Sequence, residues 1–328
     1  MSFNPQSQSA STGIRAGGAF TGKWQGHTYT ILRQLGQGAN GTVYLAVRDQ
    51  TRVALKVSDN PTALSLECER LRALSLDAHG VRLGPIVYEI DDLIIAGAAH
   101  PVLVMEYVEG VAVDEFIRAR GKEWIPLCLL RILTLTANLH DRGYSFCDLK
   151  PANILFQIGD AVPRLIDFGG VTAHGQAVKE FTEMFDRAWW GRGSRKADAA
   201  YDVFACALLG LHLIEPIGKP ELERLSSMRP TERSIWLTAR ICSLRAKNPL
   251  VSALAKGLDG NVRDAVQFRW EVMSLMDKHN TPLLAPEYAH RQQLRRRKRT
   301  RRAWDATDWG LLIAIVIFAC TLFTLLWI

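Results

Sequence analysis

Four polar residues in two neighbouring stretches have the types and spacing that chemistry on a charged group needs. The stretch FCDLKPANILF places Asp148, Lys150 and Asn153 close together, and the following LIDFGG adds Asp167 before a Phe and two glycines. A carboxylate can accept a proton, and carboxylate and amide oxygens are ligands for small, hard cations. The alternative interpretation is a polar turn between two strands, with acids that are merely solvated.

A glycine-rich stretch, LGQGANGTVYLA, lies upstream of these residues. Gly36, Gly38 and Gly41 give the spacing G-x-G-x-x-G, which alone is a weak signal because dinucleotide-binding folds share it. The glycines lead into another strand-like run, TVYLAV, and VALKV then supplies Lys56. A dinucleotide site would need a helix N-terminus directly after the glycines. The sequence therefore favours a loop between two strands that covers phosphate groups.

Taken together, these motifs resemble those of protein kinases. The glycine loop, the strand lysine, D-x-K-x-x-N and D-F-G follow one another in the order of that family. The resemblance implies ATP as cofactor, with Lys56 on its α- and β-phosphates and Lys150 against the transferring γ-phosphate. Asp148 would accept the proton of the attacking hydroxyl. Asn153 and Asp167 would hold Mg²⁺, with Mn²⁺ as an alternative cation.

The stretch SLECERLRAL has helical spacing, with Leu66, Leu71 and Leu74 expected on one side. In the kinase pattern this helix carries a glutamate that forms an ion pair with the strand lysine. Glu67 fits the spacing to Leu71 and Leu74, and Glu69 is its competitor.

The stretch LVMEYVEG resembles the hinge between the two lobes of a kinase. Backbone groups around Glu106 and Val108 would bind the adenine edge, with Met105 at the back of the pocket. Val43, Ala54 and Leu155 would enclose the ring. The full set of nucleotide-binding residues that the resemblance implies is Gly36, Gly38, Gly41, Val43, Ala54, Lys56, Glu67, Met105, Glu106, Val108 and Leu155.

Two departures from the kinase pattern concern regulation. The usual His-Arg before the catalytic acid is Phe146-Cys147 here, and the missing arginine normally binds a phosphorylated activation loop. The usual Ala-Pro-Glu triplet is absent, and Ala197-Asp198 is a poor substitute, although Asp202 matches the acid that braces the catalytic loop. We therefore expect an active kinase that does not depend on the usual loop-phosphate clamp. The sequence does not decide between three candidates for autophosphorylation: Thr172, Thr182 and Ser194.

Length and composition predict one two-lobed domain with appendages. The chain has 328 residues, and 48% of them are hydrophobic, which is enough for a sizeable core. The expected fold class is α+β, the bilobal kinase fold, with an N-lobe over about 23–104, a hinge over about 105–110 and a helical C-lobe over about 111–280. Residues 1–22, rich in Ser, Gly, Gln and Asn, are expected to be a disordered lead-in. Six scattered cysteines without a C-x-x-C pair argue for a reducing compartment and against a zinc site or a disulfide framework.

The C-terminal part combines a basic run with an apolar one. The formal net charge is +7, and the basic residues of HRQQLRRRKRTRR, in a linker over 281–303, account for it. The uncharged residues 311–328 would span roughly 27 Å as a helix, close to a hydrocarbon core. With the tryptophans before them, they predict a transmembrane helix over 309–328. The basic run would place the kinase domain in the cytoplasm, on a single-pass protein of the cell membrane.

The basic run itself has two interpretations. It could serve topology and anionic lipid head groups alone, or bind nucleic acid in a salt-dependent, sequence-indifferent way. The chain as a whole resembles the small, tail-anchored Hanks-type kinases of spore-forming bacilli. That resemblance implies serine/threonine phosphorylation of proteins, a role in sporulation and DNA as a credible activator. The other function class is a catalytically silent pseudokinase scaffold that docks DNA or lipid. The residues expected to contact nucleic acid or lipid are Arg295, Arg296, Arg297, Lys298, Arg299, Arg301 and Arg302.

Overall fold

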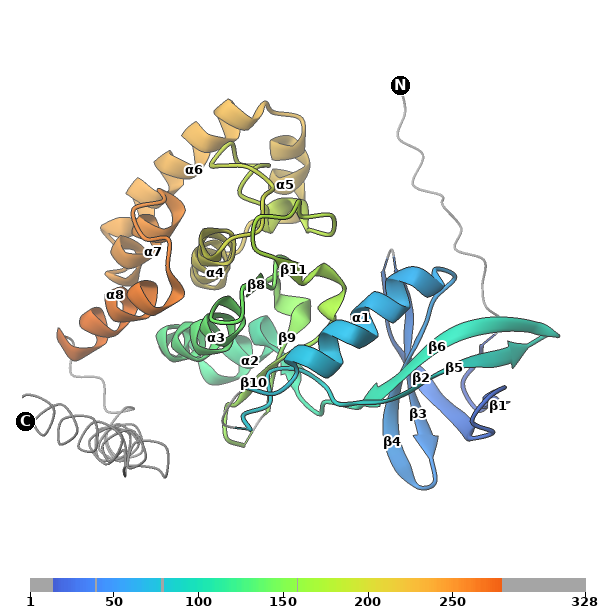
Figure 1. Ribbon diagram of the computed structural model, residues 1–328. Coiled ribbons are helices and arrows are strands. Elements are labelled where there is room, and N and C mark those ends of the chain that lie inside the picture. Colours follow the sequence, from blue (N-terminus) through green and yellow to red (C-terminus); the bar gives the residue numbers. More distant parts are fainter. Residues whose placement is uncertain (1–13, 39, 78–79, 158, 279–328) are drawn as a thin grey trace, which may run out of the picture. The chain divides into compact units, whose positions relative to one another are not determined.

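An antiparallel sheet of six strands forms the N-terminal lobe (Figure 1). In a computed structural model, residues 14–278 are described, apart from 39, 78–79 and 158. The strand order is β1-β2-β3-β4-β6-β5. The strands are β1 (Ala19–Thr21), β2 (Thr28–Gly38), β3 (Gly41–Arg48), β4 (Thr51–Val57), β5 (Val87–Ile95) and β6 (Ala98–Glu106).

Register in this sheet brings the glycine-rich hairpin next to the strand lysine. Gly38 pairs with Gly41 at the β2–β3 turn, and Val43 on β3 is the cross-strand partner of Lys56 on β4. Gly41 has φ +128°, and a Cβ there would collide with the carbonyl oxygen of Val57, so only glycine fits. The sheet therefore fixes the hairpin beside the strand that carries Lys56.

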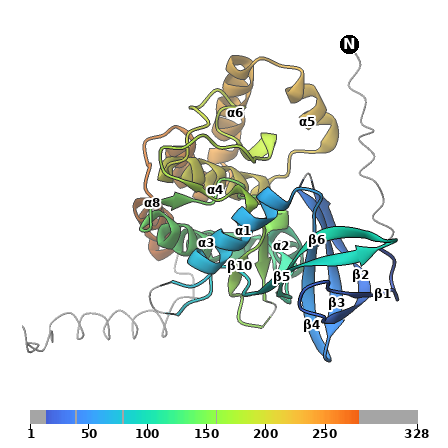
Figure 2. The ribbon, with the colours of Figure 1, turned by 45° about the vertical axis from the view of Figure 1, so that its right-hand side comes forward.

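Helix α1 (Pro61–Leu74) lies between the sheet and the C-lobe helices in both views (Figures 1 and 2). The Asn60 side chain accepts a hydrogen bond from Ala63 N at 3.0 Å and caps the helix, and Pro61 suits its first turn. Leu64, Glu67, Leu71 and Leu74 are buried on one face. Leu66 was expected on that face but is 44% exposed. It directly precedes Glu67, and neighbouring residues on a helix point in different directions, so Leu66 lies outside the buried face.

The C-terminal lobe is helical. Its long helices α3 and α4 run through the core, where α4 is buried along nearly its whole length, and α7 and α8 pack against them. The helices are α2 (Val113–Arg120), α3 (Ile125–His140), α4 (Ala199–Ile214), α5 (Lys219–Ser226), α6 (Pro230–Arg245), α7 (Leu250–Leu258) and α8 (Ala265–Lys278).

Short strands and 3-10 turns at the front of this lobe carry the catalytic motifs. β7, β9 and β10 form a three-stranded sheet, and β8 pairs with β11. These elements are β7 (Val111–Ala112), β8 (Tyr144–Ser145), β9 (Ile154–Phe156), β10 (Pro163–Leu165), β11 (Thr172–Ala173) and the turns η1 (Lys122–Trp124), η2 (Pro151–Asn153), η3 (Phe168–Gly170) and η4 (Glu183–Phe185).

The bilobal α+β fold is confirmed, with one correction to the expected boundaries. The expected disordered lead-in contains β1, which pairs with β2, and Phe20 and Ile14 pack on the sheet core. Met105 and Glu106 end strand β6, and residues 107–110 follow without helix or strand, which agrees with a buried strand that runs into a polar turn. Over the described residues, no helix is long and apolar enough to cross a membrane. The predicted transmembrane helix and the basic linker lie outside the described residues.

Candidate active site

A buried lysine on β4 joins two carboxylates that come from different elements. Lys56 Nζ lies 2.6 Å from Glu67 Oε2 on α1 and 2.7 Å from Asp167 Oδ1. Lys56 and Glu67 are buried, whereas the side chain of Asp167 is 43% exposed. The expected pair of Lys56 with Glu67 is therefore present, and Glu69 is exposed on the other side of α1.

The charges of this trio depend on one another. Burial raises the pKa of Glu67 to about 7, against the opposing effect of the Lys56 ammonium. Burial disfavours the charge on Lys56, but Glu67 and Asp167 outweigh it and raise the pKa of the lysine. Lys56 likewise outweighs the burial of Asp167 and lowers the pKa of that carboxyl. At neutral pH the site thus holds a fixed cation between α1 and Asp167.

The catalytic-loop residues form one hydrogen-bonded cluster around Asp148. Lys150 Nζ donates to Asp148 Oδ2 at 2.7 Å, and Asn153 Nδ2 donates to the same oxygen at 2.9 Å and to the Asp148 carbonyl at 3.0 Å. Thr182 Oγ1 donates to Asp148 Oδ1 at 2.8 Å and receives a bond from Lys150 at 3.1 Å. The carboxylate is therefore held in one orientation by groups on both sides.

A buried acid on α4, Asp202, holds the backbone of this loop by hydrogen bonds. Asp202 accepts the backbone N–H groups of Phe146 at 2.7 Å and Cys147 at 2.8 Å, and it lies 2.9 Å from His140 Nε2. Cys147 has φ +66°, a left-handed conformation that costs energy for a residue with a side chain. The two bonds from Asp202 hold the loop in that conformation immediately before Asp148.

Aromatic packing connects the catalytic loop to the loop of Asp167. The rings of Phe146 and Phe168 meet edge to face at 5.7 Å, and both are fully buried. Gly84 lies against this pair, because a Cβ there would be 2.6 Å from Phe168 Cζ and 3.4 Å from Leu71 Cδ2. The column of apolar groups thus reaches from α1 to the catalytic loop and leaves no room at Gly84.

We expect Gly84→Ala to lower both stability and activity. The added methyl must displace Phe168, the neighbour of Asp167, and overpacking of this kind costs about 1–3 kcal/mol. Urea unfolding and steady-state kinetics would measure the two losses. Gly159→Ala is the control, since a Cβ there meets nothing within 4 Å. Unchanged unfolding and kcat in the Gly84 variant would contradict the tight packing.

The apolar residues expected around adenine come from both lobes. Ala54 is the cross-strand partner of Met105, and Leu155 on β9 pairs with Ala112 on β7, at the start of the C-lobe. Met105 and Val108 are buried. A Cβ at Gly36 or Gly38 would meet nothing within 4 Å, so the glycine hairpin has open space beside it for a ligand.

The side chain of Glu106 makes a contact that the sequence did not indicate. It accepts from Arg164 Nη2 on β10 at 2.8 Å and from the backbone N–H of Ile86 at 3.1 Å, and it pairs with Arg82 at 3.1 Å. Burial would raise the pKa of Glu106, but Arg164 and these other donors outweigh it and lower the pKa. Arg164 also donates to the Gly84 carbonyl at 2.6 Å, so one buried arginine ties the end of β6 to the C-lobe.

The donor set fits magnesium bound together with a nucleotide. Asn153 and Asp167 are brought close because the N–H of Ile166 donates to the Asn153 carbonyl at 2.9 Å. In the part of the chain that is described, no group of three or more His, Cys, Asp or Glu could hold a metal by itself. Mg²⁺ ordinarily takes one or two carboxylates and completes its shell with phosphate oxygens and water. Two protein ligands beside an open glycine hairpin match that preference.

The segment between Gly170 and Tyr201, here called the activation segment, enters the site further than the sequence indicated. Thr182, a candidate phosphorylation site from sequence, bonds to Asp148 and Lys150. Glu180 lies over Gly169, whose carbonyl accepts a hydrogen bond from Arg70 on α1. Burial raises the pKa of Glu180, and nearby Asp167 adds to this effect. No local pattern in the sequence could have indicated these contacts, because they join residues far apart in the chain.

A sheet-rich N-lobe and a helical C-lobe joined by these groups are typical of a protein kinase, and comparisons with known proteins agree. The family described as protein kinase domain matches residues 29–237. The serine/threonine-protein kinase YabT of Bacillus subtilis (strain 168) is 36% identical over 301 residues, which cover 89% of this chain and 85% of YabT. The serine/threonine-protein kinase PrkC of the same organism is 32% identical over 158 residues, which cover 44% of this chain and 23% of PrkC.

A solved structure shares the fold at lower similarity. The kinase PK-1 of Cydia pomonella granulovirus superposes with a TM-score of 0.54 at 14% identity, covering 73% of this chain and 92% of that one. The chain therefore belongs to the protein kinase family. Its likeness to YabT over most of both chains identifies it as a protein serine/threonine kinase of the bacterial Hanks type.

Proposed function

We propose that this kinase transfers the γ-phosphate of MgATP to serine and threonine hydroxyls of cytoplasmic proteins while anchored in the cell membrane. The observation that carries the catalytic part is the buried Lys56, in contact with both Glu67 and Asp167. That contact holds α1 against the site and orients the two side chains that would bind nucleotide phosphates and metal.

Each residue of the site has a distinct task in this proposal. Asp148 accepts the proton of the substrate hydroxyl, and its bonds from Thr182 and Asn153 fix its orientation. Lys150, held against Asp148, stabilises negative charge on the transferred group. Asn153 and Asp167 would hold the magnesium ion, which supplies neutralisation of the phosphate charge when bound.

Phosphate transfer from labelled ATP by the purified full-length chain tests the catalytic part. We expect label on a pool of Ser- and Thr-containing peptides, and little label with Lys56→Ala measured beside it. Label that is equally low in both samples would instead identify a pseudokinase scaffold, the alternative function. Acid hydrolysis of the product separates phosphoserine and phosphothreonine from phosphotyrosine.

The membrane and DNA parts of the proposal rest on the C-terminal sequence. An uncharged run follows a dense basic run, and the likeness to YabT extends over 89% of the chain. A positively charged run beside a membrane span attracts anionic lipids, and the same charges can neutralise DNA phosphates. We propose DNA as the activator, bound by Arg295–Arg302.

Changing the seven basic residues at 295–299, 301 and 302 to Gln tests this assignment. We expect DNA affinity to fall at least about tenfold, and its salt dependence to flatten, because fewer counterions are released. DNA stimulation of kinase activity should disappear with it. Affinity that stays unchanged at several salt concentrations would contradict the assignment, and vesicles with and without anionic lipid would show whether lipid is the ligand instead.

A further inference from the structure

A fully buried carboxylate organises the activation segment. Asp186 has no exposed surface and accepts four hydrogen bonds: from Tyr201 Oη at 2.9 Å, Ala188 N at 3.0 Å, Trp189 N at 3.1 Å and Arg195 Nε at 2.6 Å. Burial raises the pKa of Tyr201, and the Asp186 charge adds to it, so the phenol remains a donor. A carboxylate with this many donors is a strong, directional anchor.

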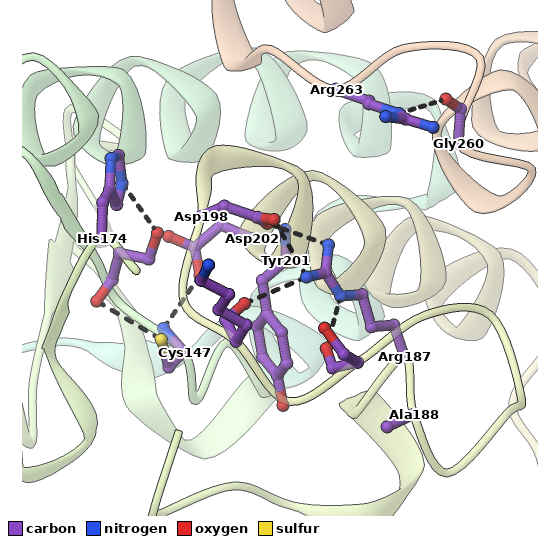
Figure 3. A network of polar contacts seen from close by, with 12 residues as sticks. Cys147, His174, Arg187, Ala188, Asp198, Tyr201, Asp202, Gly260 and Arg263 are labelled. Atoms are coloured by element: carbon purple, nitrogen blue, oxygen red, sulfur yellow. Dashed lines mark hydrogen bonds and ion pairs between the residues drawn. The ribbon is translucent and has the colours of Figure 1, made fainter. Parts of the chain in front are cut away.

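The next residue, Arg187, binds the part of the segment that leads into α4 (Figure 3). Its two Nη atoms bind the two carboxylate oxygens of Asp198 at 2.9 and 3.0 Å. Its Nε donates to the Ser194 carbonyl at 2.9 Å and Nη2 donates to the Lys196 carbonyl at 3.0 Å. In Figure 3 the guanidinium lies beside the ring of Tyr201 and between these groups, so one buried side chain fixes the whole turn.

These anchors lead directly to the catalytic residues. Asp198 also accepts the N–H of Tyr201 at 2.8 Å and caps α4, the helix whose Asp202 holds the catalytic loop. Arg195 lies over the ring of Phe181 at 4.1 Å, and Phe181 precedes Thr182, which bonds to Asp148. Both ends of the network therefore reach Asp148 through contacts that the structure defines.

Cys147 occupies the position of the arginine that, in the usual kinase pattern, binds a phosphorylated activation loop. The thiol is buried in an apolar cluster with Val178, Ala197 and Tyr201, and its Sγ donates to the Ser145 carbonyl at 3.6 Å. At Cys147 the catalytic loop thus presents a nonpolar side chain to the activation segment. A loop phosphate would find no arginine at this position.

The hydroxyls of the activation segment are mostly committed to other contacts. Thr172 is buried and donates to the Gly170 carbonyl at 2.8 Å, and Thr182 is bonded to Asp148 and Lys150. Ser194 is exposed, but its carbonyl is already held by Arg187. Phosphate on any of them is therefore not needed to place the segment, and on the first two it would break existing bonds.

We propose that Asp186 and Arg187 are positioning residues that, with their partners Arg195 and Asp198, hold the activation segment in place of a phosphate. The kinase then transfers phosphate at full rate with this segment unmodified. This inference rests on the proposed kinase function and names the internal contacts that replace the phosphate clamp.

The physical basis is the cost of leaving a buried charge without its partner. When one member of a buried, hydrogen-bonded ion pair is removed, the remaining buried charge is strongly destabilising. The elements that the pair joined then separate, because the charge is more stable in water. A displacement of about 1 Å at a catalytic group can lower a rate by about a hundredfold. Loss of the network should therefore lower kcat through the position of Thr182 and Asp148, with ATP binding largely preserved.

The first test compares the dephosphorylated full-length chain with the same chain after incubation with ATP. Lambda phosphatase removes the phosphate, and intact mass spectrometry verifies its loss. We expect the dephosphorylated sample to phosphorylate an added Ser/Thr peptide without a lag, at a rate within about twofold of the incubated sample. Ser194→Ala should behave in the same way. A lag, or activity that returns only with phosphate on the segment, would overturn the inference and leave the kinase function intact; no transfer in any sample would instead refute the kinase function.

The second test removes the anchors themselves. We expect Asp186→Asn to lower kcat at least about tenfold and Arg195→Gln about three- to tenfold, with the KM for ATP nearly unchanged. Arg195 is 44% exposed, so its variant should fold even if the Asp186 variant does not. Trypsin should cleave after the exposed Lys179 and Lys196 faster in both variants.

A comparable ion pair outside the segment provides the control. Lys256 pairs with Glu271 at 2.7 Å between α7 and α8, and its side chain is 50% exposed. Lys256→Gln should leave kcat, the KM values and the tryptic pattern unchanged. If Arg195→Gln matched Lys256→Gln in all of these measurements, the segment would not depend on the network and the inference would fail.

Discussion

Asp148→Asn is expected to lower kcat by about 10²–10⁴, the usual contribution of a positioned general base. The substitution keeps the shape of the side chain but replaces one carboxylate oxygen with an amide nitrogen, which cannot accept a proton. It also leaves too few acceptors for Lys150, Asn153 and Thr182, all of which donate to this carboxylate. Steady-state kinetics with an added Ser/Thr peptide measures the loss.

Nucleotide binding should survive this change. Lys56, Asp167 and the glycine hairpin carry the ATP contacts in our proposal, and Asp148 does not, so the KM for ATP should change by less than about threefold. Asp160→Asn, the same substitution at an exposed acid in the turn after β9, is the matched control and should have wild-type kinetics. A kcat in the Asp148 variant within a factor of about ten of wild type would remove this residue from the role of base.

Residues whose role depends on local pattern were predictable from the sequence. Glu67 could be distinguished from Glu69 because helical spacing puts it with Leu71 and Leu74, and the structure buries those three together. Lys56 could be placed because VALKV forms a strand beside the glycine hairpin. These assignments needed only the phase of one helix and the register of one sheet.

Residues whose role depends on contacts within an irregular segment were not predictable. Asp186 and Arg187 lie in a segment without helical or strand periodicity, and their partners are Arg195, Asp198 and Tyr201. Strand β1 was missed for a related reason, because it is defined by its antiparallel pairing with β2 and its Gly-rich surroundings carry no strand pattern. Tertiary contacts therefore override local composition in both places.

The cysteine at position 147, where the kinase pattern has an arginine, changes which residues must supply positive charge to the activation segment. A thiol in place of arginine removes a buried cation, and the surrounding side chains are accordingly apolar. Burial raises the pKa of Cys147, with Asp202 adding to it, so the thiol stays neutral and packs as a small hydrophobic group. The cations that order the activation segment come from the segment itself, as Arg187 and Arg195.

Lys56→Met is expected to abolish measurable phosphate transfer and to make folding stability depend more strongly on pH than in wild type. Methionine fills the volume of the lysine stem but leaves Glu67, only 2% exposed, without its cation. Burial already raises the pKa of Glu67 to about 7 with the lysine present, and loss of the lysine must raise it further. In the unfolded chain the same carboxyl ionises near its ordinary value of 4.5.

The sign of the pH effect follows from these two values. Below about pH 4.5 Glu67 is protonated in both states, so the variant pays no ionisation cost at this site. As the pH rises, the unfolded state releases a proton that the folded state retains, and the free energy of unfolding falls until the folded pKa is passed. Asp167, which also loses Lys56, acts in the same direction. Between pH 5 and pH 8 we expect the variant to lose about 1–3 kcal/mol more stability than wild type does.

Urea unfolding of wild type and variant at several pH values between 5 and 8 measures this difference. The control is the double variant Lys56→Met with Glu67→Gln, in which the buried group cannot ionise and the additional pH dependence should largely disappear. Parallel stability profiles for wild type and Lys56→Met would mean that Glu67 reaches water without the lysine. In that case the ion pair would not hold α1 against the site, and the arrangement of Lys56, Glu67 and Asp167 would need another cause.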